Sequence, residues 1–178
     1  MVILRDMIQS DIEDYVKWFT DPCQQNDWTC WDAPWEQVET TVDEERKSWT
    51  DYYQYLQTLP INYTRWKFEI EVDGQHIGWV SAYTDLGYLD NEARISAIGI
   101  DIPNRTYRNC GYGKQALTLF IDYLRGKGHT TLFTQTWSGN IPMIKLAHSL
   151  GFVEYARVKD LRKINNQQYD AITFKLNL

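Results

Sequence analysis

The amino-acid sequence predicts an α/β (α+β) fold in which about four helices flank a mixed, mostly antiparallel twisted sheet of about seven strands. Two patterns support this: segments with apolar residues at helical spacing, and short segments with the alternating or apolar character of strands. Their order is strand, two helices, three strands, helix, strand, helix and two strands, which favours antiparallel pairing early and helical crossovers later. The 178 residues are long enough to bury one core, so we expect a single domain over residues 1–178.

The first predicted strand and helix lie at the N-terminus. Residues 2–5 form a short apolar segment typical of a strand. Ser10 and Glu13 have the spacing of a capping box, in which each residue satisfies an N–H group at the helix start. Apolar residues between 12 and 19 then fall on one face of a helix.

A second helix is predicted between Thr41 and Pro60. Thr41 and Glu44 form another capping box, and apolar residues at helical spacing follow until the proline. The preceding residues, 23–36, contain three Trp but show no period. We interpret them as a Trp-rich loop or a short helix.

Three strands are predicted in the middle of the chain. Residues 66–72 alternate apolar and charged side chains, and Asp73-Gly74 is typical of a tight hairpin turn. Residues 76–83 then return antiparallel, and residues 93–102 complete the group.

Helices and strands alternate in the C-terminal part. A helical apolar face runs from about 113 to 125 and ends at two glycines. Residues 130–137 are expected to form a strand, and residues 139–151 a helix that ends at Gly151. The segment "FVEYARV" and residues 169–176 supply the last two strands.

Charge is distributed unevenly along the chain. Residues 1–101 carry 20 acidic and 7 basic side chains, whereas residues 102–178 carry 4 acidic and 11 basic ones. This split indicates two kinds of partner. The net charge of −6 and the lack of a basic, aromatic-studded motif argue against nucleic-acid binding.

The apolar runs and the cysteines of the sequence disfavour several other classes of protein. No apolar run approaches the roughly 18 residues of a membrane span, and the N-terminal apolar stretch is too short for a secretory signal. Three cysteines, Cys23, Cys30 and Cys110, make an odd number without metal-ligand spacing. We expect reduced thiols, a cytoplasmic protein, no metal and no membrane partner.

The segment "RNCGYGK", residues 108–114, places two glycines before a helical pattern, which exposes main-chain N–H groups to an anion. A P-loop is excluded because Gln115 follows Lys114 and because Arg108 stands where the first glycine is required. A dinucleotide fingerprint matches residues 111–116, but the acidic residue expected after the next strand is absent. A nucleotide-binding protein, which NAD or ATP would stabilise thermally, is therefore disfavoured.

A third template, R/Q-x-x-G-x-G/A, fits Arg108, Gly111 and Gly113. With it, "IGIDIPNRTYRNCGYGKQAL" and "NIPMIKLAHSLGF" resemble the signature segments of the GNAT superfamily of acetyl-coenzyme A-dependent N-acetyltransferases. These motifs cover about residues 95–152, and the predicted element order fits along the whole chain. Tyr169-Asp170 before the last strand looks most like the branch that includes ribosomal-protein amino-terminal, polyamine and some aminoglycoside acetyltransferases.

The resemblance implies a GNAT fold with acetyl-coenzyme A (acetyl-CoA) as cosubstrate. Residues 1–101 would form the acceptor side and residues 102–178 the coenzyme side. Loop amides would hold the pyrophosphate, a strand edge would offer main-chain bonds to the pantetheine arm, and Asn140 would either contact the coenzyme or simply cap a helix. The expected coenzyme residues are Ile100, Ile102, Arg108, Asn109, Gly111, Gly113, Lys114 and Asn140.

The proton-transfer groups that the family often uses are missing. Ala97 stands at the position of the general base and Ala147 at that of the general acid. Glu92 is the catalytic candidate, acting on the amine through water, although an exposed turn carboxylate is the simpler interpretation. Asp101 is the other strand carboxylate considered as a replacement base, and the alternative is that it only flanks the loop.

The acceptor is expected to be cationic, because the first two helices and their loop combine many Trp and Tyr with many carboxylates. We therefore predict an enzyme that moves acetyl to a primary amine of a small amine, an aminoglycoside or a peptide N-terminus. The alternative, which the two alanines favour, is a non-catalytic acyl-CoA binding module. A monomer or a homodimer is expected.

Overall fold

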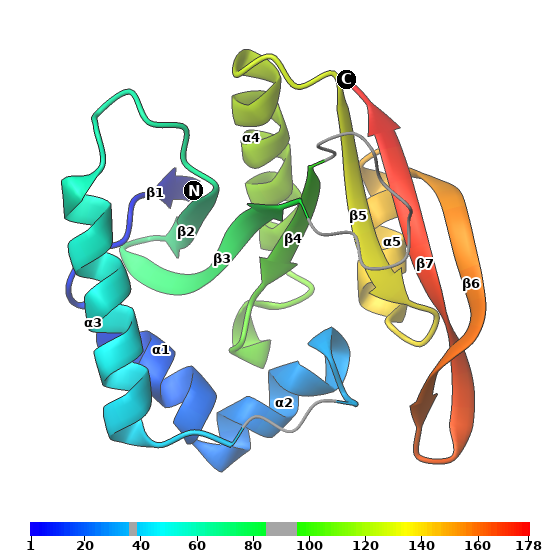
Figure 1. Cartoon of the computed structure of the whole chain (residues 1–178), viewed down its shortest axis with the longest axis horizontal. Helices are drawn as coiled ribbons and strands as arrows, with labels where there is room; N and C mark the ends of the chain where they lie inside the picture. Colours follow the sequence, from blue (N-terminus) through cyan, green and yellow to red (C-terminus); the bar gives the residue numbers. More distant parts are fainter. Residues whose placement is uncertain (36–38, 85–95) are drawn as a thin grey trace.

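The computed structural model describes residues 1–35, 39–84 and 96–178. Within them, seven strands form one sheet and five α-helices pack around it (Figure 1). The strands are β1 (Val2–Arg5), β2 (Lys67–Val72), β3 (Gln75–Tyr83), β4 (Ala97–Asp101), β5 (Thr131–Trp137), β6 (Val153–Ile164) and β7 (Gln167–Asn177). The α-helices are α1 (Asp11–Thr20), α2 (Pro22–Asp32), α3 (Val42–Thr58), α4 (Tyr112–Gly126) and α5 (Ile141–Ser149).

The sheet has the strand order β1-β2-β3-β4-β5-β7-β6. The pair β4–β5 is parallel, and every other neighbouring pair is antiparallel. The predicted mixed, mostly antiparallel sheet of seven strands is therefore confirmed. No helix of the described ranges is long and apolar enough to cross a bilayer.

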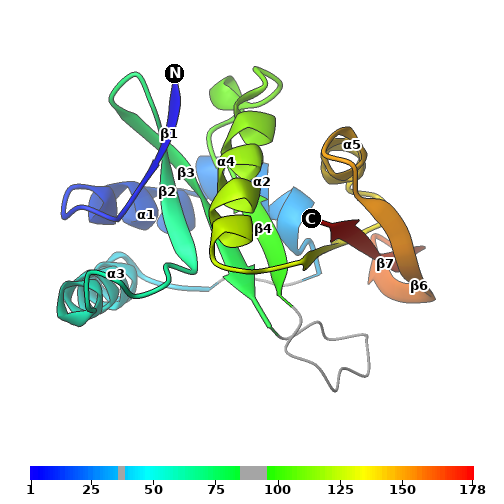
Figure 2. The same cartoon turned by 90° about the horizontal axis from the view of Figure 1, so that it is seen from above.

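Two apolar cores lie on opposite faces of the sheet, because successive side chains of a strand point to opposite sides. Ile70, Val80 and Ile98 pack with α4 and α5 in the larger core. Trp79, the neighbour of Val80, packs instead with residues of α1, α2 and α3. Figure 2 shows α4 and α5 on one side of the sheet and α3 on the other.

The two predicted capping boxes have different outcomes. The box at Thr41 is confirmed, since Thr41 Oγ1 accepts from Glu44 N–H and the Glu44 carboxylate accepts from Thr41 N–H at 2.9 Å. The box at Ser10 is wrong: Ser10 has helical angles and makes no side-chain cap bond. The Glu13 carboxylate is engaged elsewhere, because Arg46 of α3 donates two hydrogen bonds to it.

Helix α2 adds a fifth helix to the four that were expected. Asp21 caps it by accepting from the N–H of Cys23 at 2.9 Å, and Pro22 occupies its first turn. Trp28 anchors it, since this side chain is buried and its indole N–H donates to Trp18 O at 3.0 Å. The open choice for residues 23–36 is thus decided in favour of a helix that ends at Asp32.

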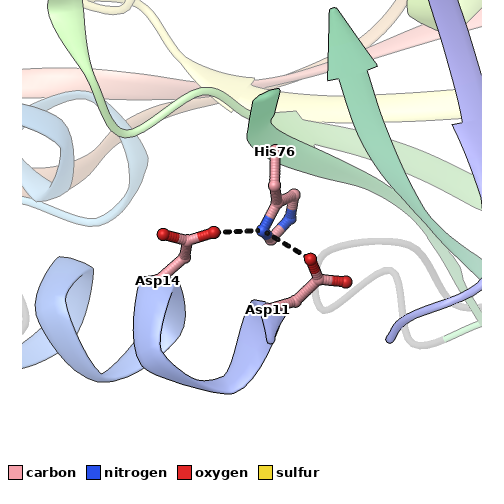
Figure 3. Close-up of side chains that lie close together, drawn as sticks. All are labelled: Asp11, Asp14 and His76. Atoms are coloured by element: carbon pink, nitrogen blue, oxygen red, sulfur yellow. Dashed lines mark hydrogen bonds and ion pairs between the residues drawn. The ribbon is translucent and has the colours of Figure 1, made fainter. Parts of the chain in front are cut away.

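A network of charged side chains, most of them buried, joins α1 to the sheet (Figure 3). His76 Nδ1 lies 3.1 Å from Asp14 and 3.5 Å from Asp11, and its Nε2 lies 2.9 Å from Glu69. The three side chains in Figure 3 lie close enough to hold a metal ion. However, both oxygens of Asp11 already accept hydrogen bonds from Arg5 at 2.6 and 2.9 Å. We therefore interpret the cluster as an ion network around a protonated imidazole.

This network predicts a loss of stability at alkaline pH. Burial opposes the charge on His76, but hydrogen bonds to Asp14 and Glu69 outweigh it and raise the pKa of the imidazole to about 9. A pKa raised on folding stabilises the protein fully below the unfolded value of about 6.5, and this contribution is lost as pH rises through about 9. The difference corresponds to about 3 kcal/mol.

Urea unfolding of wild type and His76→Gln measures this contribution. The wild type is expected to be more stable than the variant at pH 6, and the gap is expected to close by pH 9.5. His129→Gln removes an imidazole outside the network and serves as the matched control. A gap that is the same at both pH values would show that the imidazolium contributes nothing through its charge.

Candidate active site

Strands β4 and β5 diverge after a short parallel contact (Figure 1). Residues of both strands line a cleft of about 890 Å³. The two strands pair at Ala97 and Phe133, where Phe133 N–H donates a hydrogen bond to Ser96 O at 3.0 Å. The cleft is lined by the residues that come after this pair in both strands. Residues of α2, of the glycine loop and of the start of α5 complete its walls. Its volume is in the range of cofactor and small-molecule sites.

All eight residues expected on the coenzyme side line this cleft. They are Ile100, Ile102, Arg108, Asn109, Gly111, Gly113, Lys114 and Asn140. Five of them belong to one loop and the helix start that follows, so their proximity results from local chain geometry.

The glycine loop presents main-chain amides to the cleft. Asn109 and Gly111 have φ values of 60° and 82°, a left-handed backbone that Asn and Gly adopt most readily. Gly111 is the N-cap of α4 and offers no side-chain acceptor, so the N–H groups of the first turn have no cap. Because the helix dipole adds positive potential there, the loop is suited to hold an anion such as a diphosphate.

The diverging edge of β4 offers further main-chain groups. Ser96 directs its carbonyl at β5. Since this direction alternates along a strand, Ile100 and Ile102 direct their main-chain groups to the same side, which faces the cleft beyond the bridge. The carbonyl of Ile102 already accepts from Arg108 Nε at 2.7 Å. The N–H and C=O of Ile100 and the N–H of Ile102 are therefore the groups that an extended ligand would meet.

Arg108 uses its guanidinium within the protein. Besides Ile102, it donates to the carbonyls of Pro103 and of Asp27, the latter at 3.1 Å, and it lies 3.3 Å from the Asp27 carboxylate. Its contribution to the cleft is therefore positive charge and the attachment of α2.

Asn140 has two partners, and they join α5 to α2. Its Oδ1 accepts from Met143 N–H at 3.1 Å, which is the helix cap considered from the sequence. Its Nδ2 donates to Trp31 O at 2.8 Å, and Trp137 Nε1 donates to the same carbonyl at 2.9 Å. Helix α2 is thus held against the glycine loop and the start of α5 by hydrogen bonds to two of its carbonyls, those of Asp27 and Trp31.

Asp101 lines the cleft, as do Asp27 and Asp32 of α2. Burial raises the pKa of its carboxyl to about 8, as does the charge of Asp32, against the attraction of Lys67 and Arg108. A carboxylate with a pKa near the working pH is suited to general-base catalysis. Of the two roles considered from the sequence, a base or a residue that only flanks the loop, this position favours the first.

The placement of Asp101 depends on a close approach of β3. A Cβ atom at Gly78 would lie 2.0 Å from the carbonyl oxygen of Asp101, a distance that no side chain permits. The pairing of β2 with β3 shifts register next to this point, between Ile70 and Glu71. Gly78 was not singled out from the sequence, although a glycine inside a strand pattern signals such an approach.

The two alanines at the family's usual catalytic positions are core residues. Ala97 and Ala147 are fully buried, so neither position carries a proton-transfer group. His148, the neighbour of Ala147, packs its ring edge-on against Phe174. Glu92 lies outside the described residues, and its catalytic role stays a prediction.

The acceptor-side aromatic residues divide into two groups. Those of α2 and the turn after it line the cleft together with two carboxylates: Asp27, Trp28, Trp31, Asp32 and Trp35. The aromatic residues of α3 do not line it, because α3 packs against α1 and shares a core with it. Trp49 and Tyr52 surround Lys67, and Tyr55 is exposed.

Comparisons with known proteins agree with this geometry. The family model of the acetyltransferase (GNAT) domain matches residues 1–153. No curated protein matches the chain. Among solved structures, the ribosomal-protein-S5-alanine acetyltransferase of Vibrio fischeri is 19% identical, with a TM-score of 0.73 and coverage of 99% of this chain and 92% of that one.

Two further structures share the fold. Mycobacterium smegmatis RimJ, in complex with CoA-disulfide, has a TM-score of 0.72 at 17% identity, with coverage of 99% of this chain and 81% of that one. The yncA protein of Salmonella typhimurium, solved with its cofactor acetyl-CoA, has a TM-score of 0.68 at 18% identity, with coverage of 100% and 94%. At these identities the likenesses establish the fold.

Proposed function

Because the chain belongs to the GNAT acetyltransferase family, and is thereby an acyltransferase with acetyl-CoA as cosubstrate, we propose that it acetylates a primary amine of a cationic acceptor. We further propose that residues 1–178 act as one domain, in which residues 1–101 supply most of the acceptor wall and residues 102–178 most of the coenzyme wall. The observation that carries the proposal is the convergence of uncapped amides, a free strand edge and Asp101 in one cleft.

The coenzyme fits the groups that this chain presents. The amides at Gly111 and Gly113 would bind the diphosphate, with Lys114 adding positive charge. The β4 edge would bind the pantetheine arm, and the N–H of Ile100 would polarise the thioester carbonyl as an oxyanion donor does. This arrangement places the acetyl group near the end of β4, where Asp101 lies.

Proton removal from the acceptor is the step that needs a base. A primary ammonium with a pKa of about 10.4 is almost entirely protonated at neutral pH and cannot attack a thioester. In our proposal the Asp101 carboxylate takes that proton, directly or through water. The neutral amine nitrogen then forms the C–N bond as the C–S bond breaks. The nitrogen releases its second proton, which the departing thiolate takes up to give the amide and free coenzyme A.

The acceptor wall favours a molecule with more than one positive charge. Asp27 and Asp32 on α2 and Asp101 on β4 line the cleft together with the indoles of Trp31 and Trp35. Carboxylates attract cations, and aromatic faces bind them at close range. Small polyamines, aminoglycosides and peptide N-termini followed by basic residues fit this chemistry.

Release of free thiol from acetyl-CoA tests the proposal. Spermidine, an aminoglycoside and a basic N-terminal peptide are expected to include an acceptor that releases thiol well above the hydrolysis rate. An acetylated form of each acceptor, which keeps its size but lacks the reacting amine, is the matched control. Saturable acetyl-CoA binding without turnover across the panel would instead favour the non-catalytic binding module, for which the buried Ala97 and Ala147 argue.

A further inference from the structure

Lys67 of β2 holds its ammonium group inside a cage of aromatic rings. Its Nζ lies 4.2 to 5.5 Å from the centroids of four rings, and its side chain is only 14% exposed. The rings belong to Tyr15 of α1, Trp49 and Tyr52 of α3, and Trp79 of β3. Three elements therefore converge on one cation that the sequence analysis did not consider.

The caged cation lies among buried carboxylates. Glu69 Oε1 is 3.9 Å from Lys67 Nζ, and Glu69 itself is fully buried. Burial lowers the pKa of Lys67 to about 8, against the attraction of Glu69, Asp101 and Asp11. A positive charge this deep in the protein interacts strongly with its neighbours, because little water and salt screen it.

The strand register places Lys67 on the same face of the sheet as Asp101. Glu69 pairs with Trp79, and Trp79 pairs with Asp101, so these three form one row across β2, β3 and β4. Lys67 is two residues from Glu69 and therefore lies on the same face. Its Nζ stands 5.0 Å from the centre of the Trp79 ring, the residue between Glu69 and Asp101.

We propose that Lys67 is a positioning residue whose caged ammonium is the fixed countercharge that sets the protonation equilibrium of Asp101 in the cleft. The cage keeps the ammonium in one place, and one of its rings belongs to Trp79, the strand partner of Asp101. The catalytic meaning of this inference rests on the proposed function, but the electrostatic coupling itself does not.

Asp101 and Lys67 each have other charged neighbours, and these must be kept unchanged in a test. Asp32 of α2 and Arg108 of the glycine loop act on Asp101 with opposite signs. Asp11 of α1 acts on Lys67 together with Glu69. None of these side chains is altered in the experiment, so a change at Asp101 reports Lys67 alone.

The test is a carbon-13 NMR titration of the Asp101 carboxyl in the protein without acetyl-CoA, with the resonance assigned by its loss in Asp101→Asn. Lys67→Met keeps a long side chain in the cage but removes the charge, and we expect it to raise the pKa of Asp101 by about one unit or more. Lys67→Arg, which keeps the charge, is expected to restore a value near that of the wild type. Lys47→Met removes an exposed lysine of α3 and is the matched control.

The reciprocal measurement does not depend on the stability of a Lys67 variant. Coupling between two titrating groups acts equally in both directions. Removal of the charge in Asp101→Asn is therefore expected to lower the pKa of Lys67, followed through its side-chain resonances. An Asp101 pKa that is unchanged in folded Lys67→Met, or a Lys67 pKa that is unchanged in Asp101→Asn, would overturn the inference whether or not the enzyme turns over.

Discussion

Replacing Asp101 by asparagine is expected to lower kcat/KM for acetyl transfer by about 10² to 10⁴-fold, the usual contribution of a general base. Asparagine has nearly the same shape but accepts no proton from an ammonium group. The carboxyl lies on the face of the sheet that carries Trp79 and α1, opposite the face that packs against α4. We therefore expect the affinity for acetyl-CoA, measured by calorimetry, to stay near that of the wild type.

The pH dependence of the same reaction gives the prediction a second, independent readout. Only the ionised carboxyl of Asp101 takes up a proton, and its pKa is raised to about 8, so wild-type kcat/KM is expected to rise with pH up to that region. Asp101→Asn is expected to lose this limb and to follow only the growing fraction of neutral amine. An unchanged rate and pH profile in the variant would remove Asp101 from the mechanism.

Asp32→Asn is the informative companion variant. The Asp32 charge is one of the two causes that raise the pKa of Asp101, and the other is burial. Its removal is expected to shift the rising limb of the pH profile to lower pH, which is opposite to the shift expected from removal of the Lys67 charge. Opposite shifts from two neighbours would identify Asp101 as the group that both of them influence.

The order of elements could be predicted because each relies on a local signal. The hairpin at Asp73-Gly74 shows this, since both residues have the positive φ that the turn requires. Helix α2 could not be predicted with the same certainty, because its sequence has no apolar period. Its structure depends on the Asp21 cap and on contacts with distant residues, such as the bonds from Arg108 and Asn140.

The candidate site was predictable where it is made of backbone and not where it is made of side chains from several strands. The glycine loop and the start of α4 are contiguous, so a motif of a few residues describes them. The proposed role of Asp101 depends on Gly78, Asp32 and Lys67, which are 23, 69 and 34 residues away in the sequence. Only the packed sheet shows that a carboxylate between Ile100 and Ile102 faces the cleft while its neighbours face α4.

Substitution of Gly113 by leucine is expected to weaken acetyl-CoA binding by at least two orders of magnitude while the protein stays folded, because a bulky side chain here intrudes on the diphosphate cradle. Gly113 is the second residue of α4, has no left-handed backbone and lies between Ile100, Ile102 and Leu146. A Cβ here would meet these side chains at 3.6 to 3.8 Å, which is ordinary contact. Glycine is also about 1 kcal/mol less favourable than alanine in a helix, so neither substitution should cost helical stability.

The contrast between leucine and alanine at this position separates loss of binding from loss of structure. Gly113→Ala adds one methyl group within the available space, and we expect its acetyl-CoA affinity to stay within about tenfold of the wild type, since an added methyl in a packed site costs about 1 kcal/mol. The longer leucine side chain exceeds this space, and because Gly113 and its neighbours line the cleft we expect it to extend there and cover the amides and the β4 edge proposed to hold the coenzyme. Calorimetric titration with acetyl-CoA, together with circular dichroism and thermal unfolding, measures both properties. If Gly113→Leu binds as tightly as Gly113→Ala, the diphosphate does not lie on the amides of this loop, and the coenzyme must enter the cleft in another way.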